Sequence, residues 1–178
     1  MNTRIEAIRS YLKDKSVTAV LVSSPENRRY ISGFSGSNGY LLISESLTVL
    51  ATDFRYIEQS KQESPDFEIV RIGAGFEWLT NLLSSSSITD LTFESDDMTV
   101  AFHQRLSDVL SGNANGGDPV TLLPITGICD TLRMQKDAFE LESLAKAIEI
   151  ADIALDQIAP TITIRDTESD VALRLDNA

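Results

Sequence analysis

The sequence predicts an α/β fold, with a mixed sheet of about six strands layered between four or five helices. Short apolar and β-branched runs alternate with segments of helical periodicity, which is typical of this class. Two of the apolar runs, residues 40–43 and 47–51, are separated only by Ser44-Glu45-Ser46, which indicates a β-hairpin. A hairpin pairs its strands antiparallel, so we expect a mixed sheet instead of a purely parallel one.

The first part of the chain supplies the elements around a glycine-rich stretch. Apolar residues at helical spacing predict a helix over residues 3–15, and the β-branched run 17–22 predicts a buried strand. Ser24 followed by Pro25 is a helix-start signal. The stretch Gly33–Tyr40 contains three glycines and three small polar residues, so it predicts a shaped loop that leads into the hairpin.

The alternation continues after the hairpin. Helices are expected over residues 54–63 (with Asp53 as N-cap), 76–83 and 99–111, and strands over residues 67–72, 91–94 and 120–123. Asn-Gly and Gly-Gly steps predict an exposed, mobile loop between Gly112 and Pro119. Together these elements form one predicted domain over residues 1–125.

The pattern changes beyond Pro124. Spacings of three and four predict one long helix over residues 137–159, ended by Pro160, whose apolar stripe is Leu141, Leu144, Ile148, Ala151, Leu155 and Ile158. A second helix begins at Thr167 with a capping-box pattern. We expect residues 126–178 to be a junction and the first helices of a truncated further domain. The stripe then needs a partner surface, although packing on the chain's own sheet stays open.

Composition restricts the partners. Hydrophobic residues make up 42% and charged residues 24% of the 178, which is typical of a soluble globular protein. The net charge of −12 argues against nucleic acid and anionic membranes as partners. No apolar run approaches the roughly 20 residues that span a bilayer. The single cysteine, Cys129, fits a reducing interior, so we expect a cytoplasmic protein.

The order of the motifs resembles the amino-terminal domain of the Xaa-Pro aminopeptidase, prolidase and creatinase family. Around the hairpin the sequence reads Asn27-x-x-Tyr30-x-x-Gly33-Phe34-Ser35-Gly36-Ser37-x-Gly39 and then Thr52-Asp53-x-Arg55-Tyr56. A later stretch resembles the family's junction with its catalytic pita-bread domain: Leu132-Arg133-x-x-Lys136-Asp137-x-x-Glu140-Leu141. This resemblance implies a three-layer, ribonuclease-H-like fold.

The resemblance also implies a function. The chain would be the non-catalytic, amino-terminal part of a metal-dependent Xaa-Pro aminopeptidase or dipeptidase. Such peptidases bind two divalent metal ions (manganese, cobalt or zinc) through carboxylates and a histidine of the catalytic domain. No such ligand set occurs here, so we expect no catalytic or metal-ligating residue and no activity from this chain alone. The expected partners are its own catalytic domain, a second copy in a homodimer and a proline-containing peptide.

Four residues are candidates for the rim of a substrate cleft. In the related peptidases the amino-terminal domain lends residues to the cleft of the partner subunit. By this resemblance the candidates are Phe34, Ser35, Arg55 and Tyr56. For Arg55, simple pairing with Asp53 is the structural alternative.

Other chemistry-bearing residues have simpler interpretations. We expect His103 to be solvated or to cap a helix, Cys129 to be a small buried hydrophobe, and Trp78 to lie in the core. The Asp96-Asp97 pair is expected to cap the helix that begins near Thr99.

Two other function classes stay open. One is the amino-terminal part of a creatinase-like hydrolase, which uses a histidine and no metal. The other is a stand-alone dimerisation or binding module. The motifs Phe34–Gly39 and Asp53-x-Arg55-Tyr56 are more similar to the aminopeptidases than to the creatinases.

Overall fold

A computed structural model describes residues 3–86, 88–111 and 119–178. The chain divides into two compact units between Leu132 and Arg133, later than the predicted boundary at residue 125. The boundary lies later because Ile128 and Cys129 are buried in the core of the first unit. The loop predicted to be mobile, Gly112–Asp118, lies outside the described residues.

The first unit is built on a six-stranded sheet in the order β4-β3-β2-β1-β5-β6. The strands are β1 (Ala19–Val22), β2 (Tyr40–Ser44), β3 (Thr48–Thr52), β4 (Glu68–Arg71), β5 (Asp90–Glu94) and β6 (Thr121–Ile125). Strand β2 pairs antiparallel with both β1 and β3, and the other neighbours pair in parallel. The predicted mixed sheet and its hairpin are therefore confirmed.

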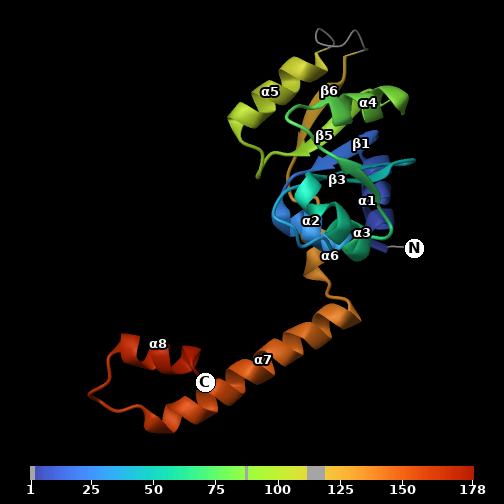
Figure 1. Cartoon of the computed structure of the whole chain (residues 1–178). Helices are drawn as coiled ribbons and strands as arrows, with labels where there is room; N and C mark the ends of the chain where they lie inside the picture. The colour runs from blue at the N-terminus through green and yellow to red at the C-terminus, as the bar shows by residue number, and fades with distance from the viewer. Residues whose placement is uncertain (1–2, 87, 112–118) are drawn as a thin grey trace. The chain divides into compact units, whose positions relative to one another are not determined.

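Helices cover both faces of this sheet (Figure 1). They are α1 (Thr3–Asp14), α2 (Pro25–Ser32), α3 (Ile57–Glu63) after the 3-10 turn η1 (Phe54–Tyr56), α4 (Glu77–Ser85), α5 (Val100–Leu110) and α6 (Asp130–Met134). Because side chains alternate along a strand, Val20 and Val22 of β1 join the core under α1 and α2. Ala19 and Leu21 join the second core, under α4 and α5.

The topology gathers several connections at one edge of the sheet. Strands β1 and β5 run parallel, and β2 begins opposite the end of β1 because that pair is antiparallel. Ser23, Gly39, Asp53 and Ser95 therefore all lie at the same edge. In open α/β sheets, ligands bind at the carboxyl edge of the strands where neighbouring connections leave in different directions.

The second unit consists of α7 (Ala138–Ile158), a 3-10 turn η2 (Ala159–Thr161) and α8 (Glu168–Asp176). The predicted long helix and its end near Pro160 are confirmed. Asp137 and Glu140 form a capping box at its start. Within this unit the apolar stripe remains open, since Leu144 is 48% and Ile148 59% exposed. In the described part of the chain, no helix has both the length and the apolar character of a membrane span.

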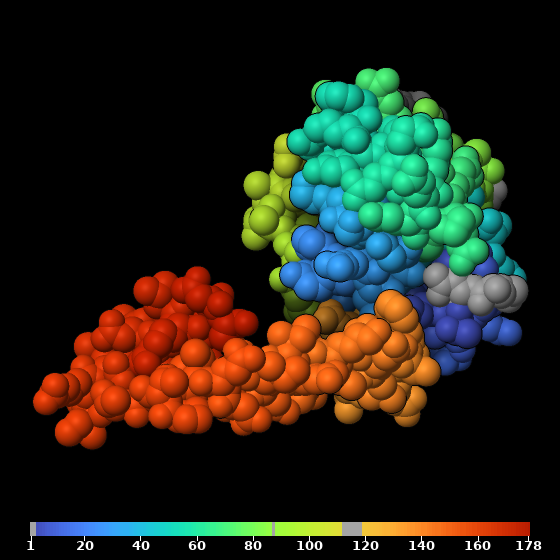
Figure 2. Space-filling model, turned by 60° about the horizontal axis from the view of Figure 1, so that its bottom comes forward, coloured from blue at the N-terminus to red at the C-terminus, as the bar shows by residue number. Residues whose placement is uncertain are grey.

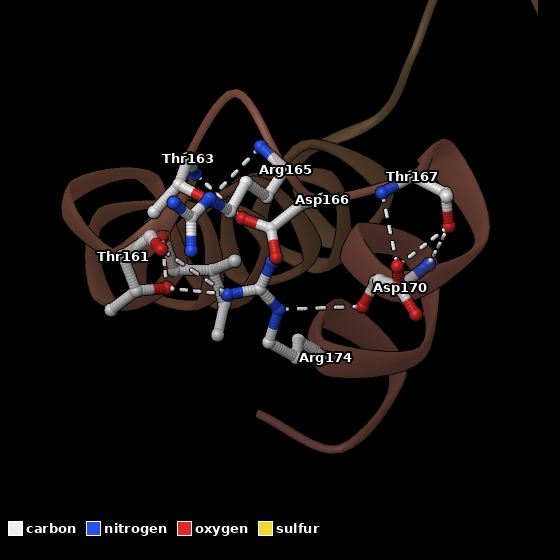
Figure 3. Close-up of polar contacts among 8 residues, drawn as sticks. Thr161, Thr163, Arg165, Asp166, Thr167, Asp170 and Arg174 are labelled. Atoms are coloured by element: carbon white, nitrogen blue, oxygen red, sulfur yellow. Dashed lines mark hydrogen bonds and ion pairs between the residues drawn. The ribbon is translucent and has the colours of Figure 1, made fainter.

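A polar cluster fixes the connection between η2 and α8 (Figure 3). The guanidinium of Arg174 donates to Thr161 Oγ1 at 3.1 Å and forms an ion pair with Asp166 at 3.0 Å. The Thr163 backbone amide donates to Asp166 at 2.6 Å, and together with Arg174 it lowers the pKa of that carboxyl. Thr167 caps α8 in a capping box with Asp170, which confirms the predicted helix start.

Candidate functional site

The helix that leads into the glycine-rich loop has the predicted start and a well-defined end. The Ser24 side chain accepts a hydrogen bond from the Asn27 backbone amide, and Pro25 occupies the first helical turn. Gly33 ends α2 with φ of 79°, a conformation that favours glycine. The loop Gly33–Gly39 therefore leaves α2 in a defined direction.

Arg28 holds this loop from inside the protein. Its side chain is 3% exposed, and its guanidinium donates to the carbonyl oxygens of Gly39 at 2.7 Å and Gly36 at 2.8 Å. Burial lowers the pKa of the guanidinium, but an arginine this basic keeps its charge. Hydrogen bonds from a charged group contribute about 1.5–3 kcal/mol each, which offsets part of the cost of burying the cation.

Phe34 fills the loop from within. The side chain is 1% exposed, and its ring meets the Tyr56 ring edge-on with centroids 5.9 Å apart. The ring centroid also lies 5.7 Å from the guanidinium carbon of Arg28. A Cβ atom on Gly36 would lie 2.2 Å from the Phe34 ring, so only glycine fits there without rearrangement. Here space, and not a positive φ, requires the glycine.

Helix α3 holds the loop from outside, where the two segments border one another on the surface (Figure 2). The Ser35 backbone amide donates to Glu63 Oε2 at 2.8 Å, and the Ser35 hydroxyl donates to Oε1 at 2.9 Å. Gln59 donates to both the Ser35 hydroxyl and Glu63. These bonds, the Ser35 amide first, lower the pKa of the Glu63 carboxyl, so the carboxylate form is favoured.

Asp53 joins the loop to the turn that follows β3. As predicted, it is an N-cap: its carboxylate accepts from the Arg55 backbone amide at 3.0 Å. The Arg55 guanidinium donates to both carboxylate oxygens, at 2.9 and 2.8 Å, and Asn38 donates at 2.7 Å. The Arg55 side chain and then Asn38 contribute most to a pKa of Asp53 that lies well below its ordinary value. Arg55 is therefore paired with Asp53, which is the structural alternative to a role at the rim of a substrate cleft.

A pocket of 240 Å³ opens beside the loop. Its lining combines arginine, carboxylate and hydroxyl groups with the Phe34 ring and comes from Pro25, Glu26, Arg28, Arg29, Phe34, Ser35, Gly36 and Ser37. Arg29 and the serines are exposed, whereas Arg28 is buried. The exposed groups offer hydrogen-bond donors to a polar or anionic part of a ligand.

The structure brings the four predicted rim residues into one neighbourhood, with different accessibility. The Arg55 side chain is 56% exposed and lies over the Tyr56 ring at 5.2 Å. The Tyr56 hydroxyl bonds to the Ser37 hydroxyl at 2.7 Å, and Ser35 is joined to α3. Phe34 lies inside, so its side chain can shape a cleft but does not offer a surface contact. A part for these residues in a substrate cleft stays a prediction.

Sequence reasoning missed two residues that organise this edge. Arg28 carries no motif, and only its position inside an otherwise ordinary helix puts it under the loop. Glu94 is 4% exposed at the end of β5 and accepts from the backbone amides of Ser23 at 2.7 Å and Ser24 at 2.8 Å. Asn27 donates to its other oxygen at 2.6 Å. A charged residue ending an apolar strand was the available signal for Glu94.

Two predictions about polar residues are wrong. His103 neither caps a helix nor stands in solvent, because its half-buried ring packs 5.0 Å from Phe93. Asp97 does not cap α5; Thr99 is the N-cap, and Asp97 accepts from the Ser23 hydroxyl at 2.6 Å. A cap bonds amides two or three residues ahead, and Thr99 has that spacing to the Phe102 amide.

The prediction for Cys129 is confirmed, because the residue is fully buried in the first core. Trp78 is only half-buried and packs against the second core from its edge. Among the described residues, no group of three or more histidine, cysteine or acidic side chains could hold a metal ion. The residues present in the described ranges therefore do not fit the metal centre that the resemblance implies for a catalytic domain.

The contact between Gly36 and Phe34 gives a first testable prediction. Gly36→Ala should lower the free energy of unfolding by roughly 1–3 kcal/mol, because the added methyl overpacks the loop interior. In Phe34→Leu the far end of the ring is gone, so adding Gly36→Ala to that variant should cost less than in the wild type. Urea denaturation measures both. Gly75→Ala is the matched control, since its Cβ would meet no atom within 4 Å. Equal costs in both backgrounds would contradict the packing explanation.

The lowered pKa of Asp53 gives a second prediction, for stability against pH. The carboxylate stabilises the fold above the ordinary pKa of about 3.9, and this contribution is lost as the pH falls toward the lower folded value. Asp53→Asn should therefore be most destabilised relative to wild type at pH 6–7, and the difference should shrink below about pH 4. Urea denaturation between pH 2 and 7 measures this. Asp66→Asn, which removes the same charge from an exposed turn, is the control. A difference that stays constant with pH would contradict the prediction.

Comparison with known proteins finds the same domain family that the sequence motifs resemble. Residues 4–135 match the creatinase/prolidase N-terminal domain. The chain is 32% identical over 156 residues to the peptidase YqhT of Bacillus subtilis, covering 87% of this chain and 42% of that protein. It thus spans less than half of that relative.

Solved structures share the fold. An Xaa-Pro dipeptidase from Bacillus anthracis superimposes with a TM-score of 0.88 at 28% identity, covering 98% of this chain and 47% of that one. The N-terminal domain of the cytoplasmic peptidase PepQ from Mycobacterium tuberculosis H37Rv gives a TM-score of 0.67 at 33% identity, covering 75% of this chain and all of that one. The match over residues 4–135 covers most of the chain, which therefore belongs to the creatinase/prolidase N-terminal domain family.

Proposed function

We propose that this chain is the non-catalytic, amino-terminal part of a metal-dependent Xaa-Pro aminopeptidase or dipeptidase. The observation that carries the proposal is the family match over residues 4–135, together with relatives of which this chain covers less than half. Among the described residues no group of three or more histidine, cysteine or acidic side chains could hold a metal ion, so the proposal assigns the metal centre to a catalytic domain outside them.

We also propose that the glycine-rich loop and the turn at Asp53 shape the substrate cleft of a partner subunit. Support comes from the construction of this surface, which is held from inside by Arg28 and from outside by Glu63. A loop fixed in this way can present groups in a constant geometry, which is what a binding surface requires. Arg55 is an exposed cation at this surface and would contact a polar or anionic part of the peptide.

The absence of catalysis and the part played by Arg55 can be tested together. The purified chain should not hydrolyse Xaa-Pro dipeptides with or without added manganese, because catalysis by a metal needs fixed ligands. A chimaera in which this chain replaces the corresponding part of the Bacillus anthracis dipeptidase should hydrolyse them. In the chimaera, Arg55→Ala should raise KM or lower kcat by about tenfold, as expected for loss of one charged contact.

Arg71→Ala in the same chimaera is the matched control, since Arg71 is also exposed and ends the neighbouring strand β4. Equal kinetics for the two variants would contradict a part for Arg55 in the cleft. Metal-dependent turnover by the chain alone, lost on chelation, would contradict its non-catalytic assignment.

Dimerisation is the third part of the proposal. The second unit leaves large apolar side chains of α7 open, and patches of this kind on a monomer commonly mark an interface. The chain should therefore sediment as a dimer. Leu144→Glu combined with Ile148→Glu should sediment as a monomer with an unchanged circular dichroism spectrum, if α7 is the contact. Lys146→Glu changes charge on the opposite side of α7 and is the control. A wild-type chain that is monomeric at high concentration would contradict this part.

A further inference from the structure

A second pocket lies at the same edge of the sheet and is lined in part by Tyr40, Met98 and Phe102, which pack against the second core. Helices α4 and α5 cover this face of the sheet (Figure 1). The volume of the pocket is 180 Å³, and its walls are Ser23, Tyr40, Asp97, Met98, Thr99 and Phe102. Ser23 follows β1 and Asp97 follows β5, two parallel strands, while β2 begins at Tyr40. The pocket thus opens over the carboxyl ends of neighbouring strands whose connections leave in different directions.

The Tyr40 and Phe102 rings line this pocket and belong to a larger aromatic group that includes Trp78 and Phe76. The Tyr40 ring stacks on Phe102, with centroids 5.7 Å apart and planes at 22°, and on Trp78 at 6.0 Å and 21°. Phe76 meets Phe102 edge-on at 5.4 Å. All four rings are only half-buried. Ring faces carry partial negative charge, so a partly exposed stack attracts cations as well as apolar groups.

Two polar groups of the pocket have unused hydrogen-bonding capacity. Asp97 is exposed, and only its Oδ2 atom has a partner within the described residues, the Ser23 hydroxyl at 2.6 Å. The Tyr40 hydroxyl has no hydrogen-bond partner in the described ranges. Burial raises the pKa of this hydroxyl, which therefore stays protonated and can donate or accept.

The neighbouring charges are already engaged. Glu94 accepts from the amides that follow β1, and Arg28 donates to the loop carbonyls. Arg105 lies over the outer Phe102 ring at 5.9 Å, and Glu26 accepts from the Ser24 hydroxyl. Asp97 is thus the carboxylate at this pocket with an oxygen available to a ligand.

We propose that this pocket binds a primary ammonium group carried on a small apolar body. Asp97 accepts from the ammonium, and the parts of Tyr40 and Phe102 that line the pocket contact the apolar body. The volume is below the roughly 300–1,000 Å³ of pockets for drug-sized ligands, so the ligand inside is about one amino-acid side chain with its amine. Free amino acids and the amino terminus of a peptide both carry this chemistry. Binding of this kind does not require peptidase activity.

Fluorescence of Trp78 can report on binding, because it is the single tryptophan of the chain and stacks on Tyr40. Titration of the 178-residue chain with L-leucinamide should give a saturable change. N-acetyl-L-leucinamide, which has the same side chain without the charge, should bind about tenfold more weakly or not at all, since a charge-assisted bond and a cation–ring contact are both lost.

A pair of adjacent variants isolates the carboxylate. Asp97→Asn keeps an oxygen acceptor for Ser23 and should weaken leucinamide binding about tenfold, the loss expected for one charged contact. Asp96→Asn removes the same charge next to the pocket, outside its lining, and should change affinity less than about twofold. No saturable signal, equal binding of the acetylated probe, or equal effects of the two variants would overturn the proposal.

Two further probes distinguish the sources of the amine. L-Leucine carries a carboxylate that Asp97 repels, whereas the tripeptide Leu-Gly-Gly places its carboxylate far from the amine. Tighter binding of the tripeptide supports an ammonium site for peptide amino termini. Tighter binding of L-leucine supports an ammonium site for free amino acids, with Arg105 facing the carboxylate.

Discussion

The buried guanidinium of Arg28 is the interaction on which the functional edge of this domain depends. A cation taken out of water must be compensated, and here the compensation comes from carbonyl oxygens of the glycine-rich loop. The loop cannot turn these carbonyls toward solvent without leaving the charge unpaired. Between the fixed carbonyls of Gly36 and Gly39, Ser37 is exposed and the half-buried Asn38 donates to Asp53. The arginine thus determines which groups of the loop a ligand can meet.

Three carboxylates, of which Glu94 is buried, make further connections at the same edge. Glu63 binds the loop at Ser35, Asp53 binds it at Asn38, and Glu94 binds the start of α2. Each joins segments that are distant in the sequence, and each is satisfied by amides, an amide side chain or an arginine. The net charge of the chain is −12, and these three acidic side chains contribute to it while they hold segments of the domain together. The hydrogen bonds that Asp53 and Glu63 accept in these connections favour their carboxylate forms and therefore lower their pKa values.

Local signals in the sequence predicted most of the fold, whereas long-range pairing decided the site. The N-caps at Ser24 and Asp53 and the hairpin were predictable because their partners lie within a few residues. The environments of Arg28 and Glu94 were not, because their partners come from other elements of the sheet edge. Burial of Phe34 could not be predicted from the sequence either, because glycine-rich loops usually lie on the surface. The ring fits inside this loop because Gly36 has no side chain.

The loop and the aromatic pocket share one piece of backbone. The Gly39 carbonyl oxygen accepts a hydrogen bond from Arg28. The next residue, Tyr40, begins β2, and its ring stacks on both Trp78 and Phe102. Burial has the largest effect on the Arg28 pKa and lowers it, while the Asp97 carboxylate of the pocket acts in the opposite direction and favours the charged guanidinium. A charge placed in the pocket would therefore act on the same guanidinium that fixes the loop. Since a ligand shifts a second site only through such differential interactions, Arg28 is the residue through which the two surfaces could be coupled.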